Sequence, residues 1–133
     1  MTGERDLDVL LATLDVERRP GTFTYVELPP SDGAPVGAVA MVDEGDAVTY
    51  VVPAGDVVAS ADFVAAWLTL TVHSALEAVG LTAAVATALA SEGIPANVIA
   101  GYRHDHVLVP AGRADAAVDA IRRLSAASRA AGS

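Results

Sequence analysis

The sequence contains no cysteine and no lysine. The absence of cysteine excludes disulfides, thiolate zinc sites and cysteine nucleophiles. All eight basic residues are arginine, against 17 acidic residues, and the formal net charge is −9. Nucleic acids and anionic membranes require a clustered basic surface, and the only basic clusters are Arg18-Arg19 and Arg122-Arg123. We therefore expect neither nucleic acid nor membrane as a partner.

Aromatic residues are also scarce, at 5% of the chain. Hydrophobic residues still make up 53% of the 133 residues, which suits one compact domain or two very small ones with a core of Val, Leu, Ile and Ala. Residues 1–10 lack the basic-then-apolar order of a signal peptide. The apolar runs are too short to span a bilayer. We expect a cytoplasmic protein.

The first half predicts one short helix and three strands. Leucines recur at helical spacing over residues 6–14, and Arg18-Arg19-Pro20-Gly21 is expected to end this helix. An acidic turn with Gly45 near its centre indicates a hairpin. The expected strands cover residues 22–28, 36–42 and 47–52, and a helical turn is expected over residues 56–60.

The second half has a clearer pattern. Residues 64–72 alternate as a strand, with Trp67, Thr69 and Thr71 on one face and Leu68, Leu70 and Val72 on the other. The remaining expected elements are a helix over 81–92, a strand over 94–102, a turn over 103–105, a strand over 106–109 and a helix over 114–124.

Two local signals lie around the helix over 81–92. Ser74 and Glu77 form a candidate capping box, but Gly80 interrupts it and predicts a short turn before the main helix; Gly93 occupies the position of a C-cap. The order strand, helix, strand, strand, helix is ferredoxin-like but lacks its last strand. Another part of the chain or a second subunit must supply that strand.

A short motif occurs twice. The segment from Tyr50 to Gly55 reads YVVPAG, and the segment from Val107 to Gly112 reads VLVPAG. Each follows a hairpin-like pair of strands and precedes an alanine-rich segment with an aspartate. The repetition indicates two related halves, of which the first is degenerate.

The second half resembles the ACT domain family, and most closely its small tandem bacterial members of mostly unknown function. The matching features are a strand ending in TVHS, then LEAVGLTAAV, then GIPANVIAGYRHDHVLVP. Residues 1–61 resemble the N-terminal half of such proteins with looser motifs. The resemblance implies an α+β, ferredoxin-like βαββαβ sandwich. We expect a degenerate ACT-like half over 1–61, an ACT-like domain over 62–126 and a flexible tail over 127–133.

The same resemblance implies a function. ACT domains commonly pair, bind free amino acids or similar metabolites between two units, and regulate an enzyme. We therefore expect a homodimer whose ligand contacts the loop after the first strand of the domain and the start of its second strand. The implied contact residues, with His106 added as a neighbour of the loop, are His73, Ser74, Leu76, Glu77, Val79, Gly80, Leu81, Asn97, Val98, Ile99 and His106.

Physical chemistry supports this location independently. A loop that enters a helix N-terminus offers free N–H groups and a favourable field for a carboxylate. Gly80 allows a ligand to approach the backbone, and Asn97 both donates and accepts hydrogen bonds. Each residue also has a plain structural explanation: Gly80 relieves a turn, Asn97 satisfies a strand edge and Ser74 caps a helix.

The three histidines suggest a metal site only weakly. His104 and His106 would share a face on a regular strand, but residues 103–105 are expected to form a turn. The favoured interpretation is that Asp105 shapes this turn and that the imidazoles bond locally. His73 is expected to meet His106 across the sheet.

No arrangement typical of an enzyme is present. The chain has no nucleophile elbow and no phosphate-binding loop, so we expect neither catalysis nor a cofactor. Three hypotheses remain: a small-molecule sensor, most simply for an amino acid; a structural or adaptor ACT protein without a ligand; and a metal-dependent activity at the three histidines.

Overall fold

The computed structural model describes residues 3–55 and 63–132, and the helical turn expected over residues 56–60 lies outside this range. The N-terminal elements are α1 (Leu7–Thr13), β1 (Val16–Arg18), β2 (Phe23–Leu28), η1 (Pro30–Asp32), β3 (Ala40–Asp43) and β4 (Val48–Pro53). The C-terminal elements are β5 (Ala65–Leu70), α2 (Leu81–Ser91), β6 (Asn97–Ala100), β7 (Asp105–Pro110), η3 (Ala111–Arg113) and α3 (Ala114–Ala131). This order confirms the α+β class.

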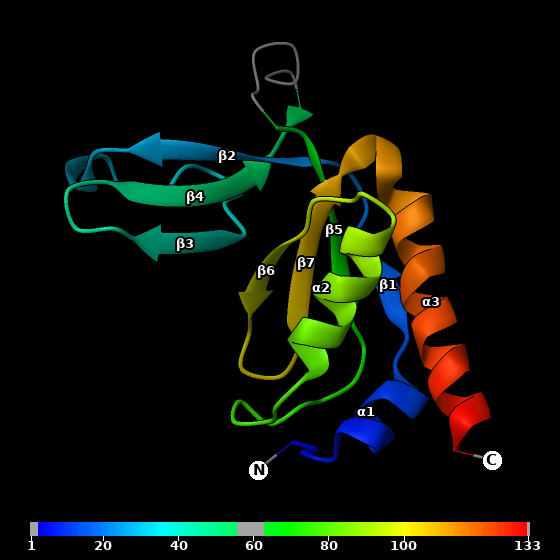
Figure 1. The fold of residues 1–133 in the computed structure, drawn as a ribbon. Coiled ribbons are helices and arrows are strands. Elements are labelled where there is room, and N and C mark those ends of the chain that lie inside the picture. Colours follow the sequence, from blue (N-terminus) through cyan, green and yellow to red (C-terminus); the bar gives the residue numbers. More distant parts are fainter. Residues whose placement is uncertain (1–2, 56–62, 133) are drawn as a thin grey trace.

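One antiparallel sheet contains all the described strands. Its order is β3-β4-β2-β5-β7-β6, and β1 also pairs with β5. The three helices cover one face of β5, β7 and β6, while β2, β3 and β4 form an arm that extends sideways from this body (Figure 1). This confirms an ACT-like, ferredoxin-like fold with two halves.

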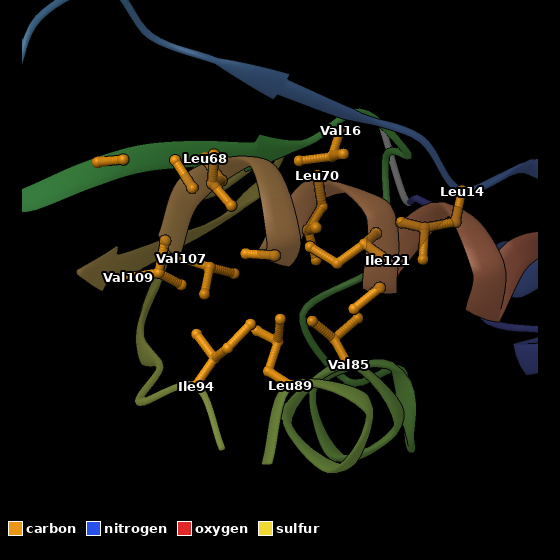
Figure 2. Close-up of a cluster of buried hydrophobic side chains, with 14 of the residues drawn as sticks. Leu14, Val16, Leu68, Leu70, Val85, Leu89, Ile94, Val107, Val109 and Ile121 are labelled. Carbon is orange, nitrogen blue, oxygen red and sulfur yellow. The ribbon is translucent and has the colours of Figure 1, made fainter. Parts of the chain in front are cut away.

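The main core lies between the sheet and the three helices (Figure 2). Leu68 and Leu70 point from β5 towards the helices, where they meet residues such as Val85 and Ile121, and these four side chains are at most 1% exposed. Trp67 belongs to a second cluster on the other face of the same strand. The predicted alternation of this strand is therefore confirmed, and its two faces separate the two cores.

The strand β1 is the strand that the second half lacks, and it pairs with the open edge of β5. Val16 lies opposite Leu70 and Arg18 lies opposite Leu68 in an antiparallel ladder. Two further bonds extend this pairing: Thr71 N–H donates to the carbonyl of Asp15 at 2.9 Å, and Arg19 N–H donates to that of Trp67 at 2.9 Å. The missing strand thus comes from the same chain, and the C-terminal domain depends on residues before it.

The helix α1 joins the same core. Asp6 caps it by accepting from the N–H groups of Asp8 and Val9, at 2.9 and 3.3 Å. The helix runs from Leu7 to Thr13, which confirms the helix predicted over residues 6–14. Leu14 is already extended, because the chain must turn immediately into β1.

The arm repeats the geometry of the C-terminal hairpin. Pro53 at the end of β4 lies opposite Phe23 at the start of β2, and Pro110 at the end of β7 lies opposite Ala65 at the start of β5. In both cases the alanine after the proline donates its N–H to the residue before the partner strand, at 2.9 Å. The repeated motif therefore marks two equivalent strand ends. In the first half, a short loop with η1 lies where the second half has α2.

Four local predictions were wrong. Ser74 and Glu77 form no capping box: Ser74 bridges to Glu4, and the carboxylate of Glu77 pairs with Arg5. The strands predicted over residues 36–42 and 94–102 are shorter, as β3 and β6. The helix α3 runs to Ala131, although the sequence predicted a flexible tail from residue 127.

The last turns of α3 are held by contacts across the molecule. The guanidinium of Arg129 donates to the carbonyl of Ala12 at 3.2 Å and to the hydroxyl of Ser125 at 2.7 Å. Ser125 is buried against α1, which makes this segment part of the fold.

We expect Leu10→Ala to destabilise the whole C-terminal domain. Leu10 is 1% exposed in the main core, and such a truncation costs about 2–5 kcal/mol of the free energy of unfolding. Val9→Ala on the same helix is the matched control, since Val9 is 45% exposed, and it is expected to change this energy by less than about 0.5 kcal/mol. Urea denaturation of both variants measures the difference. Equal effects would show that α1 lies outside the cooperative core.

Candidate functional site

The structure distributes the predicted site residues over three places. The loop between β5 and α2 carries those from His73 to Gly80, and Leu81 begins α2. The edge strand β6 carries Asn97, Val98 and Ile99. His106 lies on β7 and faces away from the helices. Only the first group forms pockets together with the helix N-terminus.

The N-terminal segment fixes the path of this loop. Glu4 N–H donates to the carbonyl of His73 at 2.8 Å, and Ala75 N–H donates to that of Glu4 at 2.9 Å. Gly3 packs so closely that a Cβ there would lie 2.6 Å from the carbonyl carbon of Ser74. The Arg5–Glu77 ion pair adds little, because both side chains are mostly exposed. The loop geometry therefore depends on backbone contacts.

Two small cavities share residues 74–76 in their walls, and we call them the loop pockets. The first has a volume of about 90 Å³ and is lined by Gly3, His73, Ser74, Ala75, Leu76, Glu77 and Tyr102. The second has a volume of about 110 Å³ and is lined by Ser74, Ala75, Leu76, Ala78, Leu81, Thr82, Ala100, Gly101 and Asp105. Four of the predicted loop residues, His73, Ser74, Leu76 and Glu77, line these pockets.

Asp105 gives the second loop pocket an acidic wall. Burial raises the pKa of this carboxyl, while the neighbouring His106 and His104 lower it. Sequence reasoning assigned Asp105 only to a turn, although it is the first residue of β7. The expected topology places the start of this strand at the same end of the domain as the loop. That position could have identified Asp105 as a candidate site residue.

The start of α2 also lines that pocket. Leu81 and Thr82 line it, and no side chain caps the helix at Gly80. Gly80 has a φ of 105°, which disfavours any residue with a Cβ, and a Cβ there would lie 2.8 Å from Leu7 Cδ2. The role of Gly80 is thus to turn the backbone into the helix. Val79 lies outside both pockets and is 81% exposed.

The histidines do not meet as predicted. The ring of His73 lies 6.4 Å from that of His104, whereas His106 contacts Trp67, with ring centroids 5.1 Å apart. The hairpin between β6 and β7 turns His104 towards the loop, and the pleat of β7 directs His106 to the face that points away from the helices. Within residues 3–55 and 63–132, no three His, Asp or Glu side chains are close enough to hold a metal.

The strand β6 borders a separate groove, which we call the arm groove. It has a volume of about 410 Å³ and is lined by Tyr25, Ala40, Met41, Val42, Glu44, Thr49, Val51, Ala96, Asn97, Val98 and Ile99. Asn97, Val98 and Ile99 therefore lie apart from the loop pockets within one chain.

Comparison with known families assigns the chain. Two ACT domain profiles match it, one over residues 2–62 and the other over residues 63–123. The chain belongs to the ACT domain family. Domains of this family are regulatory and typically non-catalytic. No curated protein gives a significant match.

Solved structures agree with this assignment. A Vibrio cholerae protein of unknown function, described as a possible transport protein, is 37% identical over 90% of this chain and 95% of its own, with a TM-score of 0.78. An Agrobacterium tumefaciens protein is 17% identical over 84% and 89%, with a TM-score of 0.63. The ligand-free regulatory subunit of Thermus thermophilus aspartate kinase is 15% identical over 82% and 95%, with a TM-score of 0.56.

These two more distant proteins share the fold. The described part of this ACT chain contains no helix that is both long and apolar enough for a transmembrane segment.

We expect Gly80→Ala to destabilise the ACT fold by about 1–2 kcal/mol, because its left-handed backbone penalises a Cβ. Gly112→Ala is the control, since Gly112 has no positive φ and no atom lies within 4 Å of the added carbon. Thermal denaturation compares the two variants. A loss of stability in Gly112→Ala as large as that in Gly80→Ala would contradict this explanation.

Proposed function

We propose that this ACT protein is a sensor or regulatory module that binds a free amino acid at its loop pockets. The observation that carries the proposal is the pairing, in one small polar cavity, of the Asp105 carboxylate with the start of α2, which has no side-chain cap. These groups complement the two charges of a zwitterion. The family assignment supports a regulatory rather than a catalytic use.

Each wall of the cavity has a defined task in this proposal. The helix N-terminus receives the ligand carboxylate through backbone N–H groups near Leu81 and Thr82. Asp105 receives the ammonium group, which compensates the burial that otherwise disfavours its charge. Ser74 supplies a hydroxyl at the border of both pockets.

The pocket volumes favour a homodimer in the same proposal. A cavity of about 110 Å³ has room for the backbone groups of a ligand and little for its side chain. The side chain then projects outwards, where a second copy could cover it with the β6 residues Asn97, Val98 and Ile99. This arrangement would unite predicted site residues that lie apart within one chain. As for the organisation of the chain, we propose that its first half ends at residue 61 and that its second half begins at residue 62.

A second candidate function is a structural or adaptor role without a ligand. The arm groove favours it, because Tyr25, Met41, Val42 and Val98 expose large apolar surfaces there, between 37% and 59% of each residue. In this alternative the groove serves assembly, and the loop pockets stay empty.

A thermal-shift screen of the twenty amino acids tests the primary proposal. We expect at least one to raise Tm at millimolar concentration. Asp105→Asn should then weaken binding about tenfold or more, because it removes the charge that receives the ammonium group.

Asp119→Asn is the matched control, since Asp119 is exposed on α3 and lines neither loop pocket. It should retain the affinity of the unmodified chain. No shift with any amino acid, with assembly intact, would favour the adaptor role. Equal losses in both variants would place the ligand elsewhere.

A further inference from the structure

Trp67 lies at the joint between the arm and the C-terminal domain. The strands β2 and β5 pair at a single position, Phe23 opposite Ala65. The ring of Phe23 lies 5.9 Å from that of Trp67, which is 4% exposed. The guanidinium of Arg19 lies 5.7 and 5.5 Å from these two rings. The arm is therefore held against the body by this packing and by the Thr24 hydroxyl, which donates to the carbonyl of Phe63 at 2.7 Å, in addition to the single strand pair.

His106 fixes the orientation of this indole. The Trp67 Nε1–H donates to His106 Nδ1 at 3.2 Å, and the Thr69 hydroxyl lies 2.9 Å from the same nitrogen. An indole N–H is only ever a donor, so Nδ1 must carry its lone pair. The neutral imidazole therefore holds its proton on Nε2, next to Gly101.

Protonation of His106 is incompatible with this contact. The new proton would sit on Nδ1 and face the indole N–H, so the bond from Trp67 would be lost and two donors would oppose each other.

The charges around His106 come from several elements. Burial lowers its pKa, as do His104 on the hairpin and Arg19 after β1, while Asp105 on its own strand raises it. Glu17 on β1 lies in the same row across the sheet, opposite Thr69, which lies opposite His106. The facing residue on β6 is Ile99, which carries no charge.

We propose that Trp67 and His106 form a proton-sensitive joint, in which protonation of His106 releases the indole and loosens the arm from the C-terminal ACT domain. The proposal requires no ligand at the loop pockets, although Asp105 both lines the second loop pocket and raises the pKa of His106. It gives the face of the sheet that points away from the helices, including the arm groove, a response to acidification.

The linkage to stability has a defined sign. The unfolded chain takes up a proton at His106 near the ordinary pKa of 6.5, whereas the folded chain does so only at a lower pH. The unfolded state therefore binds more protons between these two values, and the folded state loses stability as the pH falls through that range.

The joint can be followed directly because Trp67 is the only tryptophan. Acrylamide quenching of its fluorescence is measured between about pH 7.5 and about pH 4.5, with far-ultraviolet circular dichroism recorded at each step. We expect the quenching constant to rise about twofold or more as the indole is released, with a midpoint below the ordinary histidine pKa and with secondary structure retained.

Two variants assign the transition. His106→Gln has no group to protonate and should show a flat profile, whereas His104→Gln, two residues away, should keep the transition. A constant quenching profile in the unmodified chain, the same transition in His106→Gln, or loss of secondary structure at the same midpoint would each overturn the proposal.

The tautomer provides a second measurement on the unmodified chain if His106→Gln fails to fold. Nitrogen-15 chemical shifts of the imidazole should show Nε2 protonated and Nδ1 unprotonated near neutral pH. A proton on Nδ1 at that pH would overturn the proposal.

Discussion

The open edge of β5 is the constraint on which the rest of this structure depends. A strand–helix–strand–strand–helix unit leaves one side of its first strand unpaired, with polar backbone groups and buried leucines along it. Here β1 covers that edge, and Val16 closes the main core beside Leu70. The N-terminal elements are consequently shared: β1 and α1 complete the C-terminal domain, while the arm extends beyond it.

This sharing explains where sites can form. At one end of β5, the segment before α1 bonds to the loop that follows the strand and shapes the loop pockets. On the face of β5 that points away from the helices, Trp67 joins the arm to the domain. The amino acid proposed at the loop pockets and the proton proposed at His106 would act close together, because Asp105 lines a loop pocket and His106 follows it on β7.

The sequence predicted much of the C-terminal half because its signals are local. The side chains around Trp67 and Leu68 alternate between the two faces of β5. The VLVPAG motif that ends at Gly112 marks the end of β7. The strand β1 was missed because three residues, Val16–Arg18, carry no detectable period. The need for such a strand follows from the unpaired edge of β5, and that edge is recognised only once the topology of the sheet is known. The partners of His106 were missed for a related reason, since the strand register decides which imidazole faces Trp67 or His73.

The central claim is that the N-terminal segment is part of the C-terminal ACT domain. A fragment of residues 63–133 tests it most directly, with a synthetic peptide of residues 3–19 added in trans. We predict that the fragment alone shows no cooperative thermal unfolding, and that the peptide restores it by covering β5 and supplying Leu10 and Val16. A fragment that unfolds cooperatively as a monomer, with a Tm unchanged by the peptide, would contradict the account.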